Sequence, residues 1–145
     1  MVIIMRIYYV FNIKKEVFDI YKTTPSVLFN FFNRIYFLNK DNLNYSNSIY
    51  KQISNKFDKE ILDLKIFIKL HNKVIYSKKK DEHIINNLFK DEISIMKVKK
   101  SYIVINTNKN YTQFFNILYY FYNNCLVCDF VNQDYFFLDN VKMLV

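Results

Sequence analysis

The chain has 145 residues, enough for one domain with a substantial core, and 52% of them are hydrophobic, which excludes a disordered chain. It contains no Gly, which excludes a phosphate-binding glycine loop, a dinucleotide-binding fingerprint and a nucleophile elbow, because these turns need Gly for close backbone approach. The formal net charge is +8, but all but two of the 21 basic residues are Lys. Since base readout and bidentate phosphate contacts favour Arg, the charge is only a weak indication of nucleic-acid binding.

The composition itself explains the Lys surplus. Phe, Ile, Lys, Asn and Tyr make up more than half of the chain, and these residues have A/T-rich codons. We infer an extremely A/T-rich genome. In the absence of Gly we expect the turns to use Asn, which tolerates left-handed backbone better than most residues.

The first part of the chain predicts a strand followed by helices. Ile3–Ile13 is rich in β-branched and aromatic residues and predicts a buried strand. Glu16–Lys22 predicts a short helix. Thr24 followed by Pro25 predicts the N-cap and first residue of a second helix, and the apolar stripe within Asp41–Phe57 predicts a third.

The middle of the chain is less clearly patterned. Ile61–Leu70 alternates apolar and polar residues as a strand does, but its Leu and Lys content favours a helix, and both interpretations stay open. Lys78–Lys80 predicts the start of a solvated loop, and Asp81–Lys90 predicts a short helix.

The last third predicts two hairpins around one helix. Glu92–Val98 and Ser101–Thr107 form the first hairpin, Asn110–Asn123 the helix, and Cys125–Val131 with Asp134–Leu138 the closing hairpin. No repeat, linker or composition break divides the chain. We therefore expect a single α/β (mixed α+β) domain over residues 1–145, with a mixed central sheet of about four to five strands and packed helices.

Cys125 and Cys128 form a C-x-x-C motif, which can carry redox or zinc chemistry. Here the motif begins a predicted strand, where residues three apart point to opposite faces. A zinc site would need two further ligands, and the sequence contains only two histidines, His71 and His83. We expect buried structural cysteines, no metal, no cofactor and no catalytic residue, so that the chain is not an enzyme. Two cysteines without a targeting segment predict a cytoplasmic protein.

Two other patterns favour a structural interpretation over a functional one. Acidic residues pair at Asp58/Glu60, Asp81/Glu82 and Asp91/Glu92, and since each pair lies beside Lys, we expect solvated helix ends or turns. The aromatic face within Asn110–Asn123 could stack on bases, but at helical spacing such a face usually belongs to the core.

The first short helix is different, because its apolar residues cover more than one face. They are Val17, Phe18, Ile20 and Tyr21. Either the helix is covered by core on two sides, or it presents an aromatic patch to a protein partner. The pattern alone does not choose between these two.

Several short motifs recur in a characteristic order along the chain. In the N-terminal half they are Tyr8-Tyr9, Lys14-Lys15-Glu16, Tyr21, Ser26-Val27-Leu28-Phe29 and Lys51-Gln52-Ile53. In the tail they are Asp129-Phe130, Tyr135, Phe137, Leu138 and Val141. Their order and spacing together resemble SirA, the sporulation inhibitor of replication family of Bacillota.

The resemblance implies a small α/β protein that binds the N-terminal domain of the bacterial initiator DnaA and blocks replication initiation. The implied partner-facing surface lies on the first short helix and its neighbour, and by position includes Val17, Tyr21, Gln52 and Asn55. The family has Phe where Val17 stands, and here Phe18 follows one residue later, so we add Phe18 as an aromatic anchor. The alternative is a basic nucleic-acid-binding accessory protein that uses the Lys surplus.

Overall fold

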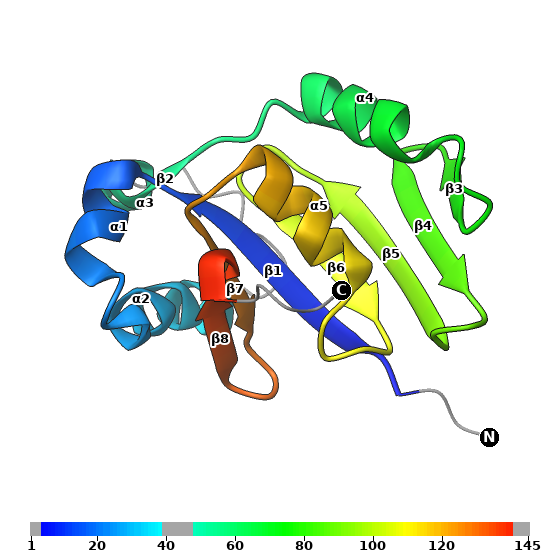
Figure 1. Ribbon diagram of the computed structural model, residues 1–145. Helices are drawn as coiled ribbons and strands as arrows, with labels where there is room; N and C mark the ends of the chain where they lie inside the picture. Colours follow the sequence, from blue (N-terminus) through cyan, green and yellow to red (C-terminus); the bar gives the residue numbers. More distant parts are fainter. Residues whose placement is uncertain (1–3, 39–47, 141–145) are drawn as a thin grey trace.

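The computed structural model describes residues 4–38 and 48–140, and its strands form one open sheet (Figure 1). Within these residues the sheet has eight strands in the order β3-β4-β5-β6-β1-β7-β8, with a short β2 beside β1. Their bounds are β1 Arg6–Ile13, β2 Ser54–Asn55, β3 Tyr76–Lys79, β4 Glu82–Asn87, β5 Glu92–Val98, β6 Ile103–Thr107, β7 Cys125–Asp129 and β8 Asp134–Phe137. The α+β class is confirmed, but a mixed sheet of four to five strands is wrong. All of these pairings are antiparallel. Short turns impose this direction on β3–β4, β4–β5, β5–β6 and β7–β8, whereas β1 pairs with strands that are distant in the sequence.

Five α-helices pack on this sheet within the described ranges, and a 3₁₀ turn, Leu138–Asn140, follows β8. Their bounds are α1 Lys15–Tyr21, α2 Pro25–Leu38, α3 Ser48–Ile53, α4 Lys59–Leu70 and α5 Gln113–Phe121. The two predicted N-terminal helices are confirmed to within a residue at their starts, and α5 is confirmed but shorter. Phe114, Phe115 and Leu118 of the predicted aromatic face are buried in the core, as expected, whereas Tyr111 is 53% exposed.

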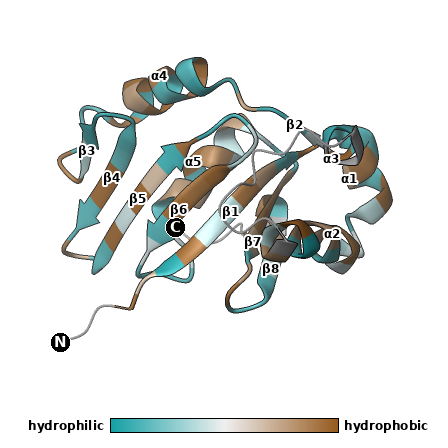
Figure 2. Cartoon of the chain, turned by 180° about the vertical axis from the view of Figure 1, so that it is seen from behind, coloured by the Kyte–Doolittle hydropathy of each residue, from teal (hydrophilic) through white to brown (hydrophobic). Residues whose placement is uncertain are grey.

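Strand β1 alternates its side chains between two cores. Tyr8 and Val10 belong to a core shared with α4 and α5, whereas Phe11 and Ile13 belong to a core shared with α1 and α2. This is the period of two that a strand imposes. Because helices cover both faces, β1 is an almost continuous apolar run. Figure 2 shows brown, hydrophobic bands along β1 and over α5, whereas β3 is largely hydrophilic.

Helix α3 ends at Ile53, so the predicted helix Asp41–Phe57 extends too far. Residues 41–47 of that prediction lie outside the described part of the chain. At its other end, Phe57 is buried in the core beneath α4 and α5, and its N–H donates to the carbonyl of Lys100 at 2.6 Å. These long-range contacts draw the chain out of the helix.

The ambiguous segment Ile61–Leu70 is helical. Its start is stabilised by Asp58, whose side chain caps α4 by accepting a hydrogen bond from the Ile61 N–H at 3.2 Å. The helix buries Leu62, Ile66 and Leu70, which are spaced four apart. The alternation that suggested a strand arose because apolar residues also occupy the opposite, solvent-facing side.

Strands β3 and β4 replace the predicted loop and the predicted helix Asp81–Lys90. The buried positions of β4 alternate as a strand requires, but two of the three are the polar residues His83 and Asn87, which hid the pattern.

His83 is held between two elements: Nδ1 lies 2.8 Å from the Tyr76 hydroxyl and Nε2 lies 2.7 Å from Asp63 Oδ1 on α4. A neutral ring satisfies both contacts, by accepting from Tyr76 and donating to Asp63. Burial lowers the pKa of His83, although Asp63 opposes this shift.

Glu92 is buried, so its predicted place in a solvated turn is wrong, although the neighbouring Asp91 is exposed. The Glu92 carboxylate accepts hydrogen bonds from the hydroxyls of Ser94 at 2.5 Å and Thr112 at 2.6 Å, and from the backbone N–H of Gln113 at 3.2 Å. Thr112 is the N-cap of α5. The carboxylate therefore ties β5 to the first turn of α5, where the helix dipole favours a negative charge.

Three non-glycine residues in the described chain adopt positive φ: Lys80 at 56°, Asp91 at 53° and Gln133 at 55°. Each lies in the turn of a hairpin, where the strand geometry demands left-handed backbone. The expectation that Asn would fill such positions is wrong at all three. Such residues cost of order 1–3 kcal/mol each and persist because the surrounding strands impose the conformation.

We expect acidification to destabilise the protein through His83. Because its pKa is lowered in the folded state, the unfolded chain binds more protons once the pH falls below about 6.5, and the free energy of unfolding decreases. Chemical denaturation at about pH 7.5 and about pH 5.5 measures this loss. The variant His83→Gln should show a smaller loss, whereas His71→Gln, which changes an exposed histidine, should keep the wild-type loss. An equal loss in both variants would contradict this assignment.

We expect Glu92→Ala to lower the free energy of unfolding by about 1–3 kcal/mol, because buried donors on β5 and α5 lose their acceptor. Denaturant titration of the wild type and the variant measures the difference. Glu82→Ala on β4 is the comparison and should change stability by less than about 0.5 kcal/mol. Equal effects of the two substitutions would show that the network contributes nothing.

Candidate functional site

Backbone pairing brings α1 and α3 together at one end of the molecule (Figure 1). The end of β1 pairs with β2, Ser54–Asn55, which directly follows α3. Next to this pairing, the Lys14 N–H donates to the carbonyl of Ile53 at 2.9 Å. Helix α1 therefore begins where α3 ends, although the two are separated by the whole of α2 in the sequence.

Helix α1 divides its apolar residues between the core and the surface. Phe18 is only 9% exposed, and its ring meets Phe137 edge to face with centroids 4.9 Å apart. Val17 and Tyr21 are half-buried and pack against the same core. Ile20 is 68% exposed. One side of this helix is therefore core, and Ile20, with the half-buried Val17 and Tyr21, leaves an apolar surface on the other. Partner binding through that surface stays a prediction.

The five residues predicted as partner-binding lie at this end of the molecule, but they differ in how far their side chains are exposed. Gln52 on α3 and Asn55 on β2 are exposed, and Val17 and Tyr21 are half-buried. Phe18 lies inside the protein, so as an exposed anchor it requires correction: the edge-to-face contact with Phe137 occupies its ring.

Ile20 is an exposed apolar residue on this surface, but the residues carried over from the family resemblance did not include it. Its signal was present in the sequence, because Ile20 lies three residues after Val17 and so shares its side of the helix. The polar surroundings are mixed in sign: Lys15 and Asp19 form an exposed ion pair at 3.1 Å on the same helix. Such a pair contributes little stability. Exposed lysines at Lys22, Lys51 and Lys56 leave this end of the molecule with a positive net charge.

The C-x-x-C motif has the structural role expected of it. Cys125 faces the core beneath α4 and α5, and Cys128 faces the core beneath α1 and α2, so the two thiols lie on opposite sides of the sheet. Both are fully buried, and burial raises the pKa of each thiol, which disfavours the reactive thiolate. Within residues 4–38 and 48–140 no group of three or more His, Cys, Asp and Glu side chains could hold a metal ion.

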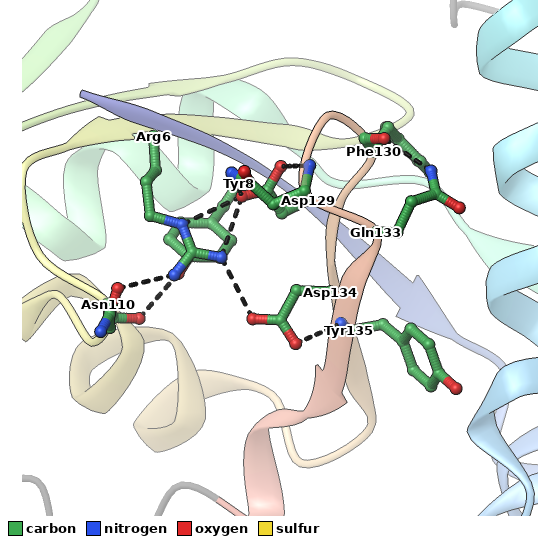
Figure 3. A network of polar contacts seen from close by, with 9 residues as sticks. Arg6, Tyr8, Asn110, Asp129, Phe130, Gln133, Asp134 and Tyr135 are labelled. Atoms are coloured by element: carbon green, nitrogen blue, oxygen red, sulfur yellow. Dashed lines mark hydrogen bonds and ion pairs between the residues drawn. The ribbon is translucent and has the colours of Figure 1, made fainter. Parts of the chain in front are cut away.

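Arg6, one of the two arginines, uses its guanidinium group for contacts within the protein (Figure 3). Its Nε donates to Asp129 at 3.0 Å, Nη2 to Asp134 at 3.1 Å and Nη1 to the side chain of Asn110 at 2.7 Å. The guanidinium also lies 4.7 Å from the ring centroid of Tyr8. Two carboxylates neutralise this charge, so it does not serve the nucleic-acid alternative.

None of the helices in the described residues combines the length and hydropathy needed to cross a lipid bilayer. In comparisons with known proteins, the family model for "Sporulation inhibitor of replication protein SirA" matches residues 6–142, which include every described helix and strand. No curated protein matches the sequence significantly. The family match confirms the resemblance seen in the short motifs: the chain belongs to the SirA family of sporulation inhibitors of replication.

Proposed function

We propose that the protein inhibits replication initiation by binding the N-terminal domain of DnaA through its α1–α3 end, without catalysing a reaction. Family membership provides the general role, which is sporulation-linked inhibition of replication. The observation that carries the proposal is the β1–β2 pairing, which places α1 and α3 side by side. Residues from two separate parts of the sequence thereby form one surface.

The chemistry of this surface suits a protein partner. Val17, Ile20 and Tyr21 supply apolar contacts at i, i+3 and i+4 of α1. Gln52 and Asn55 supply exposed amide donors and acceptors on α3 and β2, whose backbone meets the start of α1. Val17 and Tyr21 already pack on the core, so binding immobilises little additional side-chain freedom.

Phe18 acts in this proposal as a positioning residue. Its contact with Phe137 anchors α1 to the strand β8 and so sets the direction in which Tyr21 and Ile20 point. The Phe that the family carries one position earlier and the Phe present here are thus not equivalent. The anchor role passes to Tyr21, with Ile20 beside it.

We expect Tyr21→Ala to weaken binding to the DnaA N-terminal domain of the same organism by at least about tenfold, because truncating a central aromatic anchor typically costs 2 kcal/mol or more. Isothermal titration calorimetry measures the affinity. Tyr120→Ala is the matched control, since it removes an exposed tyrosine from α5 and should leave the affinity unchanged. Circular dichroism checks that both variants remain folded.

The same titration can refute the proposal in two ways. A wild-type protein that shows no binding to the DnaA domain contradicts it outright. Equal affinities for the wild type and Tyr21→Ala contradict the assignment of the surface to α1. A parallel titration with duplex DNA across a series of salt concentrations tests the nucleic-acid alternative, which predicts salt-sensitive binding that survives Tyr21→Ala.

A further inference from the structure

Helix α4 is apolar on two opposite sides. Its inner side buries Leu62, Ile66 and Leu70 against the sheet. Its outer side carries Ile61, Leu64 and Ile68, which are 52%, 57% and 60% exposed. A helix that is apolar on opposite sides normally buries both, and the sheet covers only one of them here.

The outer residues have the spacing of a coiled-coil seam. Ile61, Leu64 and Ile68 are separated by three and then four residues, which corresponds to heptad positions a, d and a. In parallel coiled coils, Ile at position a with Leu at position d favours an assembly of two helices over assemblies of three or four. We propose that two copies of this chain associate through the outer side of α4, with the two helices parallel.

The charges beside the seam match this arrangement. In the heptad that places Ile61 at a, Glu60 occupies position g and Lys65 occupies position e. In a parallel pair, g of one helix faces e of the following heptad on the other helix, so Glu60 meets Lys65 of the second copy, and the dimer has two such pairs. Neither residue forms an ion pair with the described residues of its own chain, and the Lys65 ammonium lies 5.9 Å from the centroid of the Phe121 ring on α5.

The distribution of these charges argues against a membrane, and against an antiparallel second copy, as the partner of this side of α4. One flank of the seam carries Glu60 and Phe67, and the other carries Lys65 and Lys69. An anionic membrane favours lysines on both flanks of an interfacial helix. An antiparallel copy would bring Lys65 towards Lys65, which is repulsive. A parallel copy alone pairs opposite charges on both sides.

The helix is also rigid and accessible. Asp58 caps its first turn, and Asp63 on its inner side bonds to the buried ring of His83 at 2.7 Å. Figures 1 and 2 both show α4 along the outer edge of the molecule, beyond the sheet that it covers. A second copy therefore meets a preformed helix, and little ordering entropy opposes association.

Sedimentation equilibrium of the full chain from about 10 μM to about 1 mM tests the proposal, a range suited to a weak interface. The wild type should shift from monomer to dimer with concentration. Leu64→Asp should weaken the dimer by at least about tenfold, because it places a charge at the centre of the seam. Leu88→Asp, an equal change at a residue 88% exposed in the β4–β5 turn, should leave the dimer unchanged. A wild type that stays monomeric, or equal effects of both substitutions, would overturn the proposal.

Charge reversal tests the parallel orientation. Glu60→Lys and Lys65→Glu should each weaken the dimer by roughly three- to tenfold, because each creates two like-charged pairs. The double variant restores opposite charges and should return the affinity to near the wild-type value. A double variant no tighter than the single ones would overturn the parallel arrangement. The α1–α3 surface is separate from α4, so neither result depends on DnaA binding.

Discussion

The central position of β1 is the constraint on which the rest of the structure depends. Its backbone pairs with β6 on one edge and with β7 on the other, and both of these strands come from the far end of the chain. Its side chains alternate between the two cores, so that each packed helix rests on a core to which β1 contributes. Because a shift of one residue would exchange the two sets of side chains, the register of β1 is strongly specified.

The same strand also determines the position of the proposed binding surface. The last residues of β1 extend beyond β6 and pair with β2, and this pairing holds α3 beside α1. Phe18 fixes α1 from within by its contact with Phe137, which leaves Tyr21 and Ile20 as the residues that a partner can reach. Surface and core are thus divided within a helix of two turns.

Buried polar residues explain where pattern-based prediction failed. Periodicity identified β1 and α5, whose buried positions are apolar, and it identified the β5–β6 hairpin because every second residue of both strands is buried. It identified the closing hairpin because β7 is almost wholly apolar. It failed at β4, because His83 and Asn87 occupy two of its buried positions. It failed again at Glu92, where a carboxylate normally marks the surface but here accepts hydrogen bonds at the start of α5. The partners of these groups lie up to 21 residues away in the sequence, beyond the range of any local pattern.

The amino-acid sequence by itself determined the fold class, most of the helices and strands, and family membership, because local periodicity, capping residues and motif order are properties of neighbouring residues. Only the tertiary structure decided the number and direction of the strands, the burial of Phe18 and the exposure of Ile20. It also showed that one side of α4 is uncovered. These features depend on which elements meet in space, and long-range backbone pairing sets those meetings.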